Sequence, residues 1–212
     1  TDELPLEQAP LLGCGVFTGF GAVANTADVE AGASDAVFGV GGVGLSAVQG
    51  AAVRGAGEIV AVDTVPGKLE RAESLGATHA VEGGDGVAER IREVVPDGVD
   101  YAVEAVGHPE VATQAVASLA RGGTAVVVGT PPTGTHDVGV DLQGLVLGER
   151  SVVGSFNGSY ALPLAIPMLA ELAAAGKISL EGMITDTVPL SSVNEAMGAL
   201  EGGTQVRQIL VP

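Results

Sequence analysis

The segment that most constrains this chain is the run GVGGVG at residues 39–44, which lies between a short apolar run and an Ala-rich stretch. A G-x-G-x-x-G pattern alone is weak evidence in a chain with 33 glycines. Its position, after a strand-like run at 36–38 and before a helix-like segment at 44–56, is the position that dinucleotide binding requires. We expect Gly39 to permit a tight turn, Gly41 to let the backbone approach a pyrophosphate, and Gly44 to allow close packing of helix on strand.

The residues that follow the glycines predict how such a ligand is held. Gly42 and Val43 stand directly before the expected helix at 44–56, and the free N–H groups and dipole of a helix N-terminus attract phosphate. Asp63 ends the run EIVAVD, 19 residues after Gly44, close to the roughly 20-residue spacing of a ribose-binding acid. A carboxylate there accepts hydrogen bonds from both ribose hydroxyls and repels a 2′-phosphate, which favours NAD over NADP. Lys68 either reaches the adenosine ribose or lies on a solvated helix surface, and the sequence leaves both open.

Apolar runs and helical patterns alternate along the chain, as in the βαβ units of a parallel sheet. We expect helices at 44–56, 68–75, 87–95 and 110–119, and strands at 36–38, 58–63, 79–81, 99–106, 124–128 and 151–156. This order predicts an α/β fold with a doubly wound parallel sheet of the Rossmann type. Methyltransferases that bind adenosyl cofactors share a glycine loop and an acid, but they need no pyrophosphate seat, so the three-glycine spacing argues against them.

The two ends of the chain do not fit the doubly wound pattern. Residues 1–33 precede the first strand. After residue 156 we expect a helix at 162–175, a second at 191–200 with Ser191 as a candidate N-cap, and a closing strand at 206–211. The chain is therefore divided into 1–33, a dinucleotide-binding domain at 34–156, and 157–212.

The balance of charge is strongly acidic. The 26 Asp and Glu residues against nine Lys and Arg give a formal net charge of −17, so nucleic acid and anionic membranes are not expected as partners. An acidic excess with only two lysines resembles proteins of salt-loving organisms, in which salt screens self-repulsion; an ordinary acidic protein is the alternative. No apolar stretch reaches the roughly 18 residues of a membrane span. No signal peptide is visible, and the single cysteine fits a reducing cytoplasm.

Residues 11–21, LLGCGVFTGFG, contain that cysteine. A lone Cys among Leu and Gly is by itself more often a small buried hydrophobe than a ligand. This segment, followed 25 residues after Cys14 by GVGGVG, resembles the zinc-dependent medium-chain alcohol dehydrogenases. The likeness runs from about Pro5 to Val211 and includes the motifs KLERAESLGATH, VDYAVEAVG, VVVGTPP and VPLSSVNEAMGALEGG.

The resemblance implies roles for individual residues. Cys14 matches a ligand of the catalytic zinc, and Thr18 matches a residue that packs at the nicotinamide. Arg207 matches an arginine that contacts the pyrophosphate, although alone it reads as a surface charge. Residues 151–156 match the edge strand through which dimers of the family join their sheets, so a homodimer or homotetramer is expected. The nicotinamide side of the cofactor is expected to contact Val106, Val128 and Thr130.

The resemblance also implies a second domain. Family members begin with a catalytic domain of roughly 150 residues or more, which supplies a Cys and a His ligand for the zinc. His79, His108 and His136 do not stand in metal-ligand spacing with Cys14, and one ligand cannot hold a catalytic zinc. Residues 1–33 and parts of 157–212 are then remnants of that domain.

We therefore expect the NAD-binding part of an enzyme that transfers hydride between an alcohol or aldehyde and nicotinamide, inactive as this fragment. Two alternatives stay open. One is a zinc-free relative, a quinone oxidoreductase or enoyl reductase, against which the context of Cys14 argues. The other is a stand-alone nucleotide-binding module.

Overall fold

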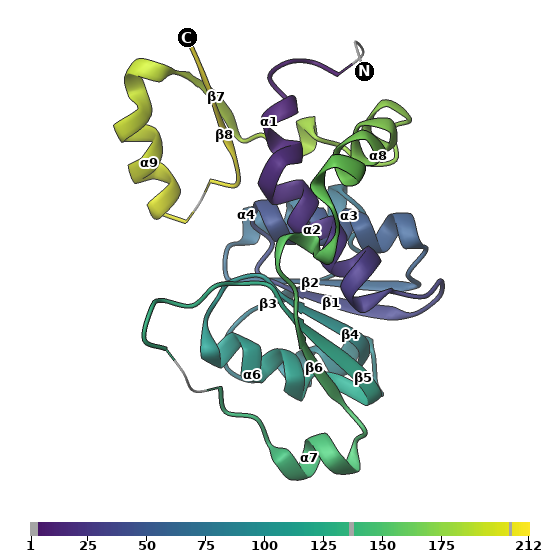
Figure 1. Cartoon of the computed structure of the whole chain (residues 1–212). Coiled ribbons are helices and arrows are strands. Elements are labelled where there is room, and N and C mark those ends of the chain that lie inside the picture. The colour runs from purple at the N-terminus through teal and green to yellow at the C-terminus, as the bar shows by residue number, and fades with distance from the viewer. Residues whose placement is uncertain (1–3, 136–137, 204) are drawn as a thin grey trace.

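The computed structural model of this chain describes residues 4–135, 138–203 and 205–212, so His136 lies outside the described residues. Six parallel strands form one sheet in the order β3-β2-β1-β4-β5-β6, with helices on both faces (Figure 1). This is the strand order of the doubly wound nucleotide-binding fold. The predicted fold class is confirmed.

The strands of this sheet are β1 Ser34–Phe38, β2 Glu58–Asp63, β3 His79–Glu82, β4 Val99–Glu104, β5 Leu119–Val127 and β6 Ser151–Gly154. Five of them begin and end within two residues of the expected bounds, whereas β5 begins five residues before the expected start at residue 124. The helices between them are α3 Gly42–Arg54, α4 Pro66–Ser74, α5 Val87–Val94, α6 Pro109–Ala117 and α7 Leu142–Leu147. α7 was not predicted. It begins after Asp141, whose carboxylate accepts the Gln143 N–H at 3.0 Å as an N-cap.

A continuous helix precedes the sheet, where the sequence analysis assigned no element. It consists of α1 (Ala9–Leu11), the π-helical segment η1 (Leu12–Val16), α2 (Phe17–Gly21) and the π-helical segment η2 (Ala22–Ala27). α2 packs directly on α3. The two backbones are so close that a Cβ on Gly19 would collide with the Val43 carbonyl oxygen. The apolar side chains of this helix, Phe20 among them, belong to the same buried cluster as those of β1 and α3. The boundary at residue 33 stays a prediction, and residues 9–27 pack on the nucleotide-binding fold.

The chain after β6 forms η3 Asn157–Ser159, α8 Leu162–Ala174, η4 Glu181–Met183, β7 Asp186–Pro189, η5 Leu190–Ser192, α9 Val193–Glu201 and β8 Gln208–Val211. Both predicted helices and the closing strand are present. β8 pairs in parallel with β7 in a separate two-stranded sheet, which stands apart from the main sheet together with α9 (Figure 1). Ser191 as N-cap is wrong: the 3₁₀ turn η5 places Ser192 at the N-cap, and its side chain makes no capping hydrogen bond.

The main sheet separates two buried clusters. One face packs against α3, α8 and the helix at 9–27, around side chains such as Val37 and Leu45. The other face packs against α5 and α6, around Phe38 and Ile91. Alternate residues of β1 thus enter opposite cores, as expected for a strand covered on both faces. No helix of the described residues is long and apolar enough to cross a membrane; the cytoplasmic location stays a prediction.

Candidate cofactor-binding site

A pocket of about 370 Å³ opens where β1, β2 and β4 end. The order of strands reverses between β1 and β4, and the crevice at such a switch point is where nucleotides bind in doubly wound sheets. Five residues that the sequence singled out line this pocket together: Gly39, Gly41, Asp63, Lys68 and Val106. They come from four different segments of the chain, so the fold alone brings them into one site.

The three glycines of the motif have the geometries that were expected of them. Gly39 has a φ of +83°, in the left-handed region, and a Cβ there would also collide with the Val106 side chain. A Cβ on Gly41 would meet no atom of the described residues within 4 Å, so the backbone is open to the pocket. A Cβ on Gly44 would collide with the Gly39 carbonyl oxygen, so only glycine lets α3 start this close to β1. Phosphate binding by this loop stays a prediction.

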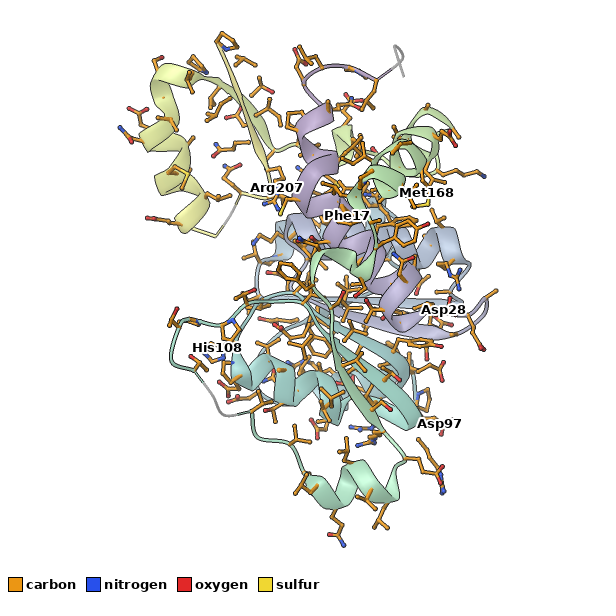
Figure 2. All side chains as sticks on the ribbon, in the orientation of Figure 1. Phe17, Asp28, Asp97, His108, Met168 and Arg207 are labelled. Carbon is orange, nitrogen blue, oxygen red and sulfur yellow. The ribbon has the colours of Figure 1, made fainter. Side chains whose placement is uncertain are left out.

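Two positive groups meet at the start of α3: the N-terminus of the helix itself and the guanidinium of Arg207. Gly42 and Val43 open the helix, and the N-cap Gly41 offers no side-chain cap to their N–H groups. The guanidinium of Arg207 lies against this helix start, where a Cβ on Gly42 would sit 2.7 Å from Nη2. The same nitrogen would be 2.9 Å from a Cβ on Gly15. Figure 2 shows Arg207 next to the helix that carries Phe17.

Arg207 makes no ion pair with an acid among the described residues; the ion pairs found there involve other groups. Within the part of the chain that the structure describes, its guanidinium donates one hydrogen bond, from Nη1 to the Val206 carbonyl oxygen at 3.3 Å. A half-buried guanidinium and the positive end of a helix dipole therefore face each other without a carboxylate between them. Such an arrangement is unfavourable by itself and favours an anion that accepts from both.

Asp63 is held at the rim of the pocket by two backbone groups. Its Oδ2 accepts the Val40 N–H of the glycine loop at 3.0 Å, and its Oδ1 accepts the Val65 N–H at 3.0 Å. Each carboxylate oxygen keeps a second lone pair, so the side chain is oriented and still able to accept from ribose hydroxyls. Lys68, half-buried on α4, lines the same pocket. The role of Lys68 at the ribose stays a prediction.

The three residues expected on the nicotinamide side lie on two adjacent loops. Val106 follows β4, is 53% exposed, and packs over Gly39. Val128 and Thr130 follow β5; Val128 is half-buried against the core, and Thr130 is exposed. The two loops touch through their backbones, since a Cβ on Gly107 would lie 2.7 Å from the Thr130 carbonyl oxygen.

Sequence reasoning missed part of the pocket wall. Gly83 and Gly84 after β3, with Val111 and Gln114 of α6, line it opposite the glycine loop. Gln114 Nε2 donates to the Gly84 carbonyl oxygen at 3.5 Å. No motif marks these residues, because the loop after β3 and helix α6 are far apart in the chain and meet only in the folded structure. Glu104, the last residue of β4, was also missed, although an acid in the otherwise apolar end of that strand was a visible signal.

Cys14 and Thr18 lie on the helix at 9–27, four residues apart and thus on one side of it. Cys14 is a free, exposed thiol, so the common role of a buried small hydrophobe does not apply. Thr18 is half-buried. Across residues 4–135, 138–203 and 205–212, no three His, Cys, Asp or Glu side chains are grouped as metal ligands.

Two of the histidines have partners close to their own elements. His79 Nε2 lies 2.6 Å from Glu58 Oε2, across the neighbouring strands β3 and β2. His108 is the N-cap of α6, and its Nδ1 accepts the Glu110 N–H at 3.3 Å. Both histidines thus have local structural contacts.

Comparison with known proteins identifies the family to which this fold belongs. A family model described as zinc-binding dehydrogenase matches residues 42–175. The chain belongs to this family. The resemblance that the sequence motifs indicated is thereby confirmed.

Relatives of known name cover almost the whole chain. It is 39% identical over 209 residues to S-(hydroxymethyl)glutathione dehydrogenase of Haemophilus influenzae, an alignment of 96% of this chain with 54% of that protein. It is 36% identical over 215 residues to alcohol dehydrogenase 6 of Peromyscus maniculatus, which covers 100% of this chain and 57% of that protein. The chain thus spans a little more than half the length of these relatives.

Solved structures give the same picture. An alcohol dehydrogenase zinc-binding domain protein from Burkholderia ambifaria matches with a TM-score of 0.94 and 40% identity, over 100% of this chain and 57% of that one. Benzyl alcohol dehydrogenase from Acinetobacter calcoaceticus matches with a TM-score of 0.94 and 35% identity, over 99% of this chain and 58% of that one.

Proposed function

We propose that this chain is the NAD-binding part of a zinc-dependent alcohol dehydrogenase, which transfers hydride between an alcohol or aldehyde and nicotinamide. The observation that carries the proposal is the pairing of Arg207 with the start of α3 beside the open glycine loop. Two positive groups without an acidic partner in the described residues fit a pyrophosphate. When bound, NAD supplies the carbon that accepts or donates hydride.

The residues of this chain bind and orient that cofactor. The N–H groups at Gly42 and Val43, together with Arg207, hold the pyrophosphate. Asp63, fixed by two backbone N–H groups, accepts from the ribose hydroxyls, and Lys68 lies beside it. The nicotinamide end is bounded by four residues, Thr18, Val106, Val128 and Thr130.

We propose that the alcohol or aldehyde is bound jointly with a second domain, in which case Cys14 contributes one thiolate ligand to the catalytic zinc. Apolar side chains exposed outside the main sheet support a missing partner domain: Leu6 is 86%, Leu164 61%, Leu190 57% and Met197 54% exposed. Such apolar surface argues against a stand-alone module. The chain by itself is then expected to bind NAD without turnover, and alcohol oxidation by these 212 residues alone would contradict this division of roles.

The cofactor assignment is tested by titrating the chain with NAD and with NADP in a calorimeter. We expect NAD to bind at least about 10-fold more tightly, because the Asp63 carboxylate repels a 2′-phosphate and accepts from the free hydroxyls. Asp63→Asn removes the charge and should bring the two affinities to within about threefold of each other. Glu93→Ala, which removes an exposed acid on α5, is the matched control and should leave the preference unchanged. Failure of the wild-type chain to bind NAD would contradict the proposal.

A further inference from the structure

Glu104 connects the loop after β4, whose Val106 lines the pocket, with the loop after β5, which carries Val128 and Thr130. Its Oε1 accepts the N–H of Val106 at 2.8 Å and the N–H of Gly107 at 2.7 Å. Its backbone carbonyl oxygen accepts the N–H of Val128 at 2.9 Å and the N–H of Gly129 at 3.1 Å. One residue at the end of β4 therefore fixes the first turn of both loops.

The backbones of the two loops are in direct contact. Gly107 has a φ of +84°, and a Cβ on it would lie 2.7 Å from the Thr130 carbonyl oxygen. A Cβ on Gly129 would collide with the Gly107 N–H group and would lie 2.8 Å from Glu104 Oε2. Since the backbones are in contact, the hydrogen bonds of Glu104 set the position of the loop after β4 relative to the loop after β5. Val106, whose side chain packs over Gly39, is placed by the same turn.

A contribution to fold stability alone does not explain why a glutamate occupies position 104. The side chain is 1% exposed, and within the described part of the chain its Oε2 has no hydrogen-bond partner. A buried carboxylate oxygen without a partner destabilises a fold. The residues paired with Glu104 on the neighbouring strands, Phe38 and Val127, are both apolar. A similar apolar residue at this strand end would avoid the cost, but it could not accept from Val106 and Gly107.

The geometry points to Glu104 as a positioning residue for the nicotinamide half of the cofactor, which rests on the proposed NAD-binding function. It acts through the loops and not by contact with the ligand. Its carboxylate shapes the turn at Val106, and its backbone holds the turn that leads to Val128 and Thr130. The hydrogen bonds that orient Asp63 on the adenosine side, from the N–H groups of Val40 and Val65, are separate from those of Glu104.

The test compares NAD with ADP-ribose, which keeps the adenosine, both ribose rings and the pyrophosphate but lacks the nicotinamide. Calorimetric titration of Glu104→Ala should show an NAD affinity lowered at least about 10-fold and an ADP-ribose affinity within about twofold of wild type. Glu104→Gln keeps the side-chain oxygen that accepts from both N–H groups, so it should restore most of the NAD affinity. Glu93→Ala, on exposed surface, should change neither ligand.

The outcomes separate this inference from the function on which it rests. The inference is overturned if Glu104→Ala loses affinity for both ligands equally or for neither. It is also overturned if the wild-type chain binds NAD and ADP-ribose with equal affinity. Each of these results leaves the proposed NAD binding intact. A wild-type chain that binds neither ligand overturns the proposed function as well. If Glu104→Ala does not fold, Glu104→Asp, whose carboxylate is one methylene too short to reach both N–H groups, must show the same selective loss of NAD. An unchanged ratio in that variant also overturns the inference.

Discussion

At the scale of single residues, the most unusual group outside the pocket is Asp35 in β1. Its side chain is completely buried, and neither carboxylate oxygen has a hydrogen-bond partner in the part of the chain that the structure describes. Burial raises the pKa of this carboxyl to about 7, because the charged form loses its hydration in an apolar core. The sequence alone did not predict that Asp35 is buried, because its burial depends on the packing of both faces of β1.

Asp35 makes stability depend on pH. Its folded pKa lies above the unfolded value of 3.8, so its stabilisation is fully present below about pH 4 and is lost as the pH rises towards 7. Between pH 5 and pH 8 this loss amounts to about 3 kcal/mol. Urea unfolding of Asp35→Asn should show a smaller decline over that range than the wild type. Asp97→Asn, at an exposed position (Figure 2), is the matched control and should decline like the wild type.

A second prediction at the scale of single residues concerns Arg207 and the affinity for NAD. Arg207→Gln should weaken NAD binding about 10- to 100-fold, because a charge-assisted hydrogen bond to phosphate is lost beside the start of α3. Isothermal titration of the 212-residue chain measures the change. Arg121→Gln removes an exposed guanidinium that pairs with Glu149 and should leave the affinity unaltered. Equal effects of the two substitutions would mean that only net charge matters.

At the scale of elements, β6 is an edge strand of the main sheet. Among the described residues it pairs with β5 alone, and three of its four residues are exposed. Val152 on β6 is 42% exposed, and Leu142 and Val146 on the adjoining α7 are each 71% exposed. An exposed strand edge with apolar neighbours invites pairing with another chain. We expect two copies of this chain to associate along β6.

The association is checked by light scattering after gel filtration. The wild-type chain should run as a dimer, and Val152→Lys should shift it to a monomer, because a lysine on an edge strand opposes edge-to-edge pairing. Val94→Lys adds the same charge on α5 and should leave the dimer in place. A monomeric wild-type chain at micromolar concentration would contradict the expectation.

Elements also show where prediction from sequence succeeded. β2 has the predicted bounds because EIVAVD is a buried apolar run with polar ends, and α8 is marked by its apolar periodicity. β7 and the helix at 9–27 were missed. β7 becomes a strand only by pairing with β8, and the helix contains four glycines between residues 13 and 21 that weaken its pattern.

At the scale of the whole molecule, the charge of −17 is largely uncompensated. The structure has three ion pairs among its described residues, Arg54–Asp28, His79–Glu58 and Arg121–Glu149. Most carboxylates therefore repel one another through solvent, and salt screens this repulsion over about 3 Å at 1 M. We expect the melting temperature to rise by on the order of 5 °C between 0.1 M and 1 M KCl.

Calorimetric melting in KCl measures this dependence. Sorbitol at matched osmolality is the control, since it stabilises folded proteins without screening charge. A melting temperature that stays level or falls with KCl would favour an ordinary acidic protein over one adapted to salt.

The sequence by itself determined the fold class, the family and the start of the cofactor site. Those features depend on local pattern: alternation of apolar runs, and glycines whose positions only glycine can occupy. The tertiary structure decided which distant groups meet. It placed Arg207 against α3, tied Asp63 to the glycine loop, and turned Glu104 into the link between two loops. The contacts of Asp63 and Glu104 arise because parallel strands bring their carboxyl ends to one edge, where residues far apart in the chain become neighbours. The contact of Arg207 arises because the chain before β8 packs back against the start of α3.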